Sequence, residues 1–139
     1  MFQRWPHGAV IEAWRRCTFG VLPSTGLEAC ATVVMEANAL GRPMIVTRVG
    51  GLPEIVDDGQ SGLLVAPGDV GDLAAAMQRL IDDHELRERM SAASVTKATT
   101  LMASVIVPRI EAAYGSVLAR KSAQLTDPAG FSHSRASRA

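Results

Sequence analysis

Two glutamates, Glu28 and Glu36, are the residues whose type and spacing could carry chemistry in this chain. They lie in the segment LEACATVVMEANALGRP, residues 27–43, with seven residues between them. Eight residues along a helix cover about 12 Å, whereas glycosidase carboxylates that act on one bond lie roughly 5–9.5 Å apart. A shared acid–base pair is therefore not the natural interpretation. Two alternatives remain: two solvated charges on an ordinary helix, or two acceptors at opposite ends of one long ligand.

The residues between the two glutamates favour an anionic ligand. They begin a predicted helix directly after a predicted strand, and the free N–H groups at a helix start attract an anion such as a diphosphate. Ala29 and Ala31 are small enough to let the backbone approach a ligand. Thr32 and Glu36 are four residues apart and share one helix face. Because carboxylates accept strongly from hydroxyls, the residues suggest a nucleotide-sugar site at the carboxyl end of a strand, where open parallel sheets bind ligands.

Three short apolar segments, residues 19–24, 43–47 and 62–67, predict the strands that would position this site. They lack polar alternation, which is typical of strands buried on both faces of a parallel sheet. The predicted helices are residues 9–17, 31–40, 52–56, 72–83, 85–94 and 108–121.

Alternating strands and helices predict an α/β fold with a Rossmann-like parallel sheet and flanking helices. Three strands are half the usual number for a doubly wound domain, so we expect a sheet edge that pairs with a partner or with a second copy. Asp69 is a predicted helix N-cap, with Asp72 completing a capping box. The polar residues 95–100 are expected to break the helical pattern, and Pro108 suits a helix first turn. We assign residues 1–121 to the domain and the Ser/Ala/Arg-rich residues 122–139 to a disordered tail.

The bulk composition excludes several classes of function. The chain has 139 residues, 47% of them apolar, and no formal net charge, which argues against a nucleic-acid or anionic-membrane surface. It contains no run of about 18 apolar residues, so no integral membrane segment is expected. Cys17 and Cys30 make no disulfide framework, and the three histidines lack metal-ligand spacing. We therefore expect a cytoplasmic chain with no metal and no cofactor.

A longer run of motifs adds a family resemblance. Residues 21–69, VLPSTGLEACATVVMEANALGRPMIVTRVGGLPEIVDDGQSGLLVAPGD, resemble the C-terminal donor-binding domain of retaining GT-B glycosyltransferases of family 4 (glycosyl transferases group 1). The ordered motifs are LPS at a strand end, two glutamates seven residues apart, EANALGRP, VGGLPEIV and DGQSGLLVAPGD. Looser similarity extends over residues 9–114. The resemblance implies that the chain is the C-terminal half of such a GT-B domain.

The resemblance implies a role for each site residue. Glu28 would lie by the hydroxyls of the donor sugar as the catalytic carboxylate, and Glu36 would accept hydrogen bonds from the ribose. The backbone around Cys30, Ala31, Thr32 and Val33 would face the sugar and diphosphate of a nucleoside-diphosphate sugar, the donor substrate. There is no Asp-x-Asp motif, so a metal-dependent mechanism is not implied.

The chain also departs from the family pattern. Its loop has Ala29-Cys30-Ala31 where the family often has glycines, and the family's basic pyrophosphate clamp and acceptor domain have no counterpart here. The chain alone is therefore expected to be inactive. One alternative is a non-catalytic nucleotide-sugar-binding or regulatory module that pairs with a separate N-terminal half. Another is a related epimerase or phosphorylase. Phosphorylases of this fold use a lysine that binds pyridoxal phosphate, whereas the only lysines here, Lys97 and Lys121, are far from the motif.

Overall fold

The computed structural model describes residues 5–126, with the side chains of residues 5–121. The chain forms two compact units, one ending at Met102 and the other beginning at Ala103. The candidate site lies wholly in the first unit.

The first unit is a three-stranded parallel sheet with helices on both faces. In chain order its elements are α1 (His7–Arg16), β1 (Gly20–Leu22), α2 (Thr32–Ala39), β2 (Met44–Thr47), α3 (Leu52–Ile55), β3 (Gly62–Val65), α4 (Val70–Asp82) and α5 (His84–Thr100). The strands lie in the order β1-β2-β3, with Val21 opposite Ile45 and Ile45 opposite Leu63. The predicted α/β class, with a Rossmann-like parallel sheet and flanking helices, is confirmed.

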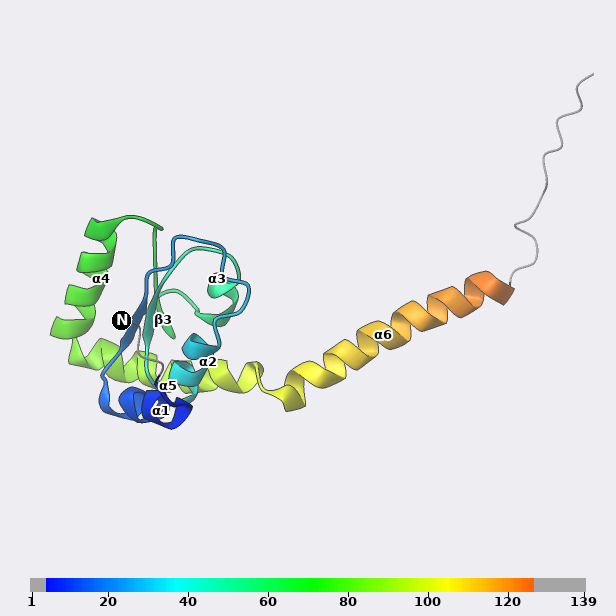
Figure 1. Ribbon diagram of the computed structural model, residues 1–139, viewed down its shortest axis with the longest axis horizontal. Helices are drawn as coiled ribbons and strands as arrows, with labels where there is room; N and C mark the ends of the chain where they lie inside the picture. Colours follow the sequence, from blue (N-terminus) through cyan, green and yellow to red (C-terminus); the bar gives the residue numbers. More distant parts are fainter. Residues whose placement is uncertain (1–4, 127–139) are drawn as a thin grey trace, which may run out of the picture. The chain divides into compact units, whose positions relative to one another are not determined.

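The central strand β2 explains why the strands show no polar alternation. All four of its residues are buried. Met44 and Val46 pack into a core cluster with α2 and α3, whereas Ile45 packs into a second cluster with α4 and α5. Figure 1 shows α4 on one side of the sheet and α2 and α3 on the other. Successive side chains of a strand point to opposite faces, so both sets must be apolar when both faces are covered.

Two helix predictions are wrong. Residues 95–100 do not break the helix, because α5 continues to Thr100. The hydroxyls of Thr96, Thr99 and Thr100 donate to backbone carbonyls three or four residues earlier, so these polar groups find partners within the helix. The second unit consists of α6 (Ala103–Thr126), which begins five residues before Pro108 and contains this proline in its interior.

The N-cap of α4 is confirmed, but the capping box differs from the prediction. Asp69 caps the helix by accepting from the Asp72 backbone N–H at 2.9 Å. The Asp72 carboxylate does not return to the Asp69 N–H. It accepts instead from the backbone N–H of Ala66, just beyond β3, at 2.8 Å, and so fastens the end of this strand to α4.

Two sequence expectations concern the C-terminal region. The helical stretch His84–Lys121 contains an 18-residue window with a mean hydropathy of 1.3, so it could cross a membrane by length and composition alone, which is weak evidence for a membrane segment. The sequence prediction of no membrane segment was based on uninterrupted runs of about 18 apolar residues. Mean hydropathy is a looser criterion that tolerates polar residues within the window. Of the predicted tail, residues 122–126 continue α6, and residues 127–139 lie outside the described part.

Candidate functional site

The loop between β1 and α2 carries Glu28 at the carboxyl end of the sheet. β1 ends at Leu22, and Pro23 and Ser24 then lead the chain away from the strand. The Ser24 hydroxyl donates to Oε1 of Glu28 at 2.8 Å. The Glu28 side chain is half-buried, so one carboxylate oxygen is held by the protein.

Two hydrogen bonds fasten this loop to the end of the neighbouring strand. The buried Thr47, last residue of β2, donates its hydroxyl to the Ser24 carbonyl at 2.6 Å. The Gly51 backbone N–H donates to the Glu28 carbonyl at 2.7 Å. The backbone that carries the predicted catalytic carboxylate is thus positioned by residues more than twenty positions later in the chain.

The glycine pair Gly50-Gly51 is required by this packing. Gly50 has a φ of +51°, and a Cβ there would overlap the backbone of Glu28. A Cβ on Gly51 would overlap the carbonyl oxygen of Ala29. The pair therefore lets the β2–α3 loop lie directly against the backbone of the Glu28 loop.

The start of α2 presents free backbone donors. Ala31 is the N-cap and makes no side-chain capping bond; its carbonyl accepts from the N–H groups of Val34 and Met35. The N–H groups of Thr32 and Val33 have no hydrogen-bond partner within residues 5–126. These are the donors that a helix start offers to an anion.

The absence of glycine at positions 29–31 does not strain this loop. No described residue other than glycine has a positive φ, so Ala29, Cys30 and Ala31 lie in regions that side chains tolerate. Cys30 is exposed, with its Sγ 3.7 Å from the Met35 Sδ, whereas Ala31 is buried. The three residues that differ from the glycine-rich family loop therefore add side chains at positions where no positive φ is required.

Glu36 lies in the second turn of α2, and its side chain is 28% exposed. Its Oε1 is 3.1 Å from Nε2 of His7, the first residue of α1. The structure therefore places the two predicted glutamates on either side of the helix start, Glu28 before it and Glu36 within it. The sequence did not predict the contacts of Ser24, Thr47 and His7, because all three depend on how separate segments meet.

Arg48 does not face this site. Its guanidinium pairs with the Asp58 carboxylate at 2.8 Å, with both side chains about half exposed. It is therefore a charge on the surface of the β2–α3 loop.

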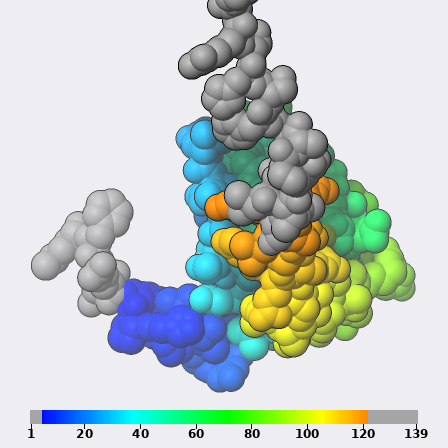
Figure 2. All heavy atoms as spheres, turned by 90° about the vertical axis from the view of Figure 1, so that its right-hand side faces the viewer, coloured from blue at the N-terminus to red at the C-terminus, as the bar shows by residue number. Residues whose placement is uncertain are grey.

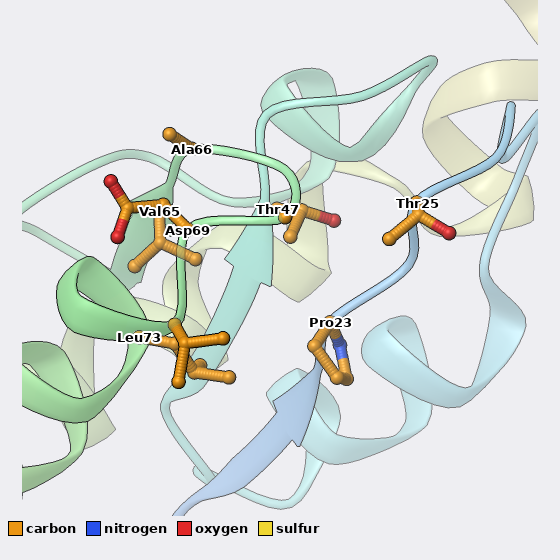
Figure 3. Close-up of a pocket in the computed structure, with 9 residues that line it drawn as sticks. Pro23, Thr25, Thr47, Val65, Ala66, Asp69 and Leu73 are labelled. Carbon is orange, nitrogen blue, oxygen red and sulfur yellow. The ribbon is translucent and has the colours of Figure 1, made fainter.

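A hollow lies at the carboxyl ends of the three strands (Figure 3). It is lined by Pro23, Thr25, Thr47, Val65, Ala66, Gly68, Asp69, Val70 and Leu73. Its volume of about 190 Å³ is below the roughly 300–1,000 Å³ of a typical ligand pocket. It includes none of the six predicted site residues, and shares only Thr47 with the scaffold of the Glu28 loop.

The described residues contain no group of three His, Cys, Asp or Glu side chains able to hold a metal ion. The groups described around the start of α2 are the carboxylates of Glu28 and Glu36, the hydroxyls of Ser24 and Thr47, the His7 imidazole and free backbone N–H groups. Such a set can bind hydroxyls and an anion.

Comparison with known proteins identifies a family that this chain matches. Residues 1–96 match the family model described as glycosyl transferases group 1. The chain is 37% identical over 113 residues to a D-inositol 3-phosphate glycosyltransferase of Thermobifida fusca, covering 81% of this chain and 26% of that protein. The chain thus spans about a quarter of the length of this curated relative.

Solved structures share the fold. A sucrose-phosphate synthase from Thermosynechococcus elongatus aligns with a TM-score of 0.74 and 28% identity, over 86% of this chain and 30% of that one. Anabaena HepE, whose structure was solved in complex with UDP-glucose, aligns with a TM-score of 0.70 and 24% identity, over 77% of this chain and 30% of that one. At this identity the second likeness concerns the fold alone.

Proposed function

Since this chain belongs to the glycosyl transferases group 1 family, we propose that it forms the donor-binding part of a retaining family 4 glycosyltransferase. The donor is a nucleoside-diphosphate sugar, and the transferred group is a hexosyl unit. The chain corresponds to the C-terminal half of the GT-B donor-binding domain. Because it spans about a quarter of its relative's length, the activity belongs to a larger protein or complex.

One observation carries this proposal. The two glutamates stand on either side of a helix start whose first N–H groups have no partner in the described chain. A nucleoside-diphosphate sugar has the matching order of groups: sugar hydroxyls, an anionic diphosphate, and ribose hydroxyls. Glu28 binds the sugar end, the N–H groups around Cys30, Ala31, Thr32 and Val33 bind the diphosphate, and Glu36 binds the ribose.

The chemistry assigned to the site is group transfer. The bond from the sugar C1 to the diphosphate oxygen breaks, and a bond from C1 to an acceptor hydroxyl oxygen forms on the same face of the sugar. The nucleoside diphosphate leaves, and the proton of the acceptor hydroxyl passes to the departing diphosphate oxygen. Glu28 lies near the positive charge that develops on the sugar ring, where a carboxylate stabilises it electrostatically.

The contacts of this chain alone give weak binding. A few hydrogen bonds to charged groups contribute roughly 1.5–3 kcal/mol each, and the helix start roughly 0.3–1 kcal/mol. Association costs about 4 kcal/mol or more. A dissociation constant near the millimolar range follows, and we expect little transfer without an acceptor-binding domain.

Titration of the ¹⁵N-labelled chain with UDP-glucose tests this function. We expect the amide signals of Thr32 and Val33 to shift with a millimolar midpoint. Glu36→Ala should weaken the binding, while Glu85→Ala should not, because Glu85 is an exposed glutamate of α5 with no place at the site. Unchanged amide signals up to high millimolar donor, or equal affinity of the Glu36→Ala chain, would refute the assignment.

A second candidate function is a non-catalytic binding or regulatory module that pairs with a separate N-terminal half. The two edges of the sheet favour it. On β3, the outward N–H of Leu64 is capped by the Asp58 carboxylate at 2.9 Å, and that of Ala66 just beyond it by Asp72. On β1, the Gly20 N–H donates to the Pro43 carbonyl beside β2. The backbone N–H and C=O of the next residue, Val21, therefore point away from β2. They have no backbone partner in the described part of the chain.

The open β1 edge can add a strand, whereas the capped β3 edge cannot do so without losing two hydrogen bonds. Co-expression with an acceptor-domain chain would support the module if the two proteins purify together. Val21→Pro should then prevent pairing, while Leu64→Pro on the capped edge should leave the complex intact. A monomeric chain that captures neither an acceptor domain nor a second copy would contradict this second function.

A further inference from the structure

We propose that His7 is a positioning residue for Glu36: it holds the carboxylate so that its second oxygen is presented to the ribose of a nucleotide. This inference rests on the proposed function, in which Glu36 is the ribose acceptor. It adds to that function a residue from a different helix.

The contact itself defines the orientation. Nε2 of His7 lies 3.1 Å from Oε1 of Glu36, with the two side chains 72% and 28% exposed. An ionised carboxylate only accepts hydrogen bonds, so Nε2 carries the proton and donates. Oε2 of Glu36 has no partner within the described residues. One oxygen is held, and the other is open to the neighbouring hydroxyls of a ribose.

No residue of α2 could do this work. The positions one turn away from Glu36 are Thr32, Val33, Ala39 and Leu40, and none is a cation or donates to the carboxylate. Without His7, the long glutamate side chain would have to be ordered by the ligand, at a cost to affinity.

The contact is not needed to hold α1 in place. Trp14 packs against the core cluster of α2 and β2, and the Arg42 guanidinium donates to the carbonyl of Arg15 at 2.9 Å. Figure 2 shows the blue atoms of α1 directly against the cyan atoms of the α2 region. Alanine is a better helix former than histidine. His7→Ala should therefore fold as stably as the natural chain.

Comparing UDP with 2′,3′-dideoxy-UDP isolates the ribose contact. In the natural chain the ratio of the two dissociation constants should favour UDP. His7→Ala should reduce this ratio by roughly two- to twelvefold, the factor that corresponds to ordering one side chain. His7→Gln, whose amide can still donate, should restore most of the ratio. The thermal midpoint should stay unchanged in both variants, which separates positioning from a structural role.

The outcomes distinguish this inference from the proposed function. If Glu36→Gln abolishes the preference for UDP but His7→Ala leaves it unchanged, the positioning role is wrong and the ribose role stands. A loss in His7→Ala that His7→Gln does not restore would also overturn the positioning role. If the natural chain shows no preference and Glu36→Gln changes nothing, the ribose role itself fails, and the inference fails with it.

Discussion

Replacing Gly50 by alanine tests whether the glycine pair supports the Glu28 loop. Gly50 and Gly59 both have a positive φ, of 51° and 74°. A Cβ on Gly50 would overlap the Glu28 backbone, whereas a Cβ on Gly59 would meet nothing within 4 Å. The two substitutions therefore share the backbone strain and differ only in the contact with the loop.

The expected magnitudes follow from this difference. The left-handed conformation costs an alanine roughly 1–2 kcal/mol, which is the whole effect expected for Gly59→Ala. Gly50→Ala adds an overlap with backbone that cannot rotate away, and overpacking of this kind costs typically about 1–3 kcal/mol. We expect a total of about 2–5 kcal/mol for Gly50→Ala, a large part of the roughly 5–15 kcal/mol stability of a typical domain.

Urea unfolding followed by circular dichroism measures both free energies of unfolding. The amide signals of Glu28 and Ala29 report whether the loop moves; they should shift in Gly50→Ala and stay in place in Gly59→Ala. Equal costs for the two substitutions, with unmoved loop signals, would refute the claim that this glycine is needed for the close approach.

Three further predictions concern other parts of the first unit. Lys97→Met should cost roughly 1 kcal/mol in urea unfolding, because the Lys97 ammonium is 17% exposed and pairs with Asp57 at 2.7 Å; no change would show the pair to be solvent-screened. Burial raises the pKa of the Cys17 thiol, and the Arg42 guanidinium partly opposes this shift. Iodoacetamide should therefore modify the exposed Cys30 first and Cys17 only at higher pH, which mass spectrometry of the labelled chain measures. The folded state favours the neutral Cys17 thiol, so the free energy of unfolding should fall as pH rises through this raised pKa. Asp69→Ala should lower the unfolding free energy by about 1 kcal/mol through loss of the α4 cap, and an unaffected midpoint in urea would contradict this.

The positions of the two glutamates relative to α2 could be predicted from the sequence. The spacing of Glu28 and Glu36 around a strand-to-helix transition predicts their places before and within α2, because a strand end and a helix start are local events. The N-cap at Asp69 followed in the same way from adjacent residues. The helical residues 95–100 were missed because their polar types favour a loop, whereas in α5 their hydroxyls bond to carbonyls of the helix itself.

The tertiary structure decided what supports the glutamates. Thr47 and Gly51 hold the Glu28 loop, and His7 reaches Glu36 from twenty-nine residues away. None of these contacts has a periodicity or a motif of its own, because each depends on the parallel sheet bringing separate segments to one edge. The sequence by itself placed two carboxylates and a helix start along one segment, and the roles proposed for them toward a sugar, a diphosphate and a ribose stay predictions. Only the packing of the strands and of α1 decided which oxygens of those groups are held and which are free.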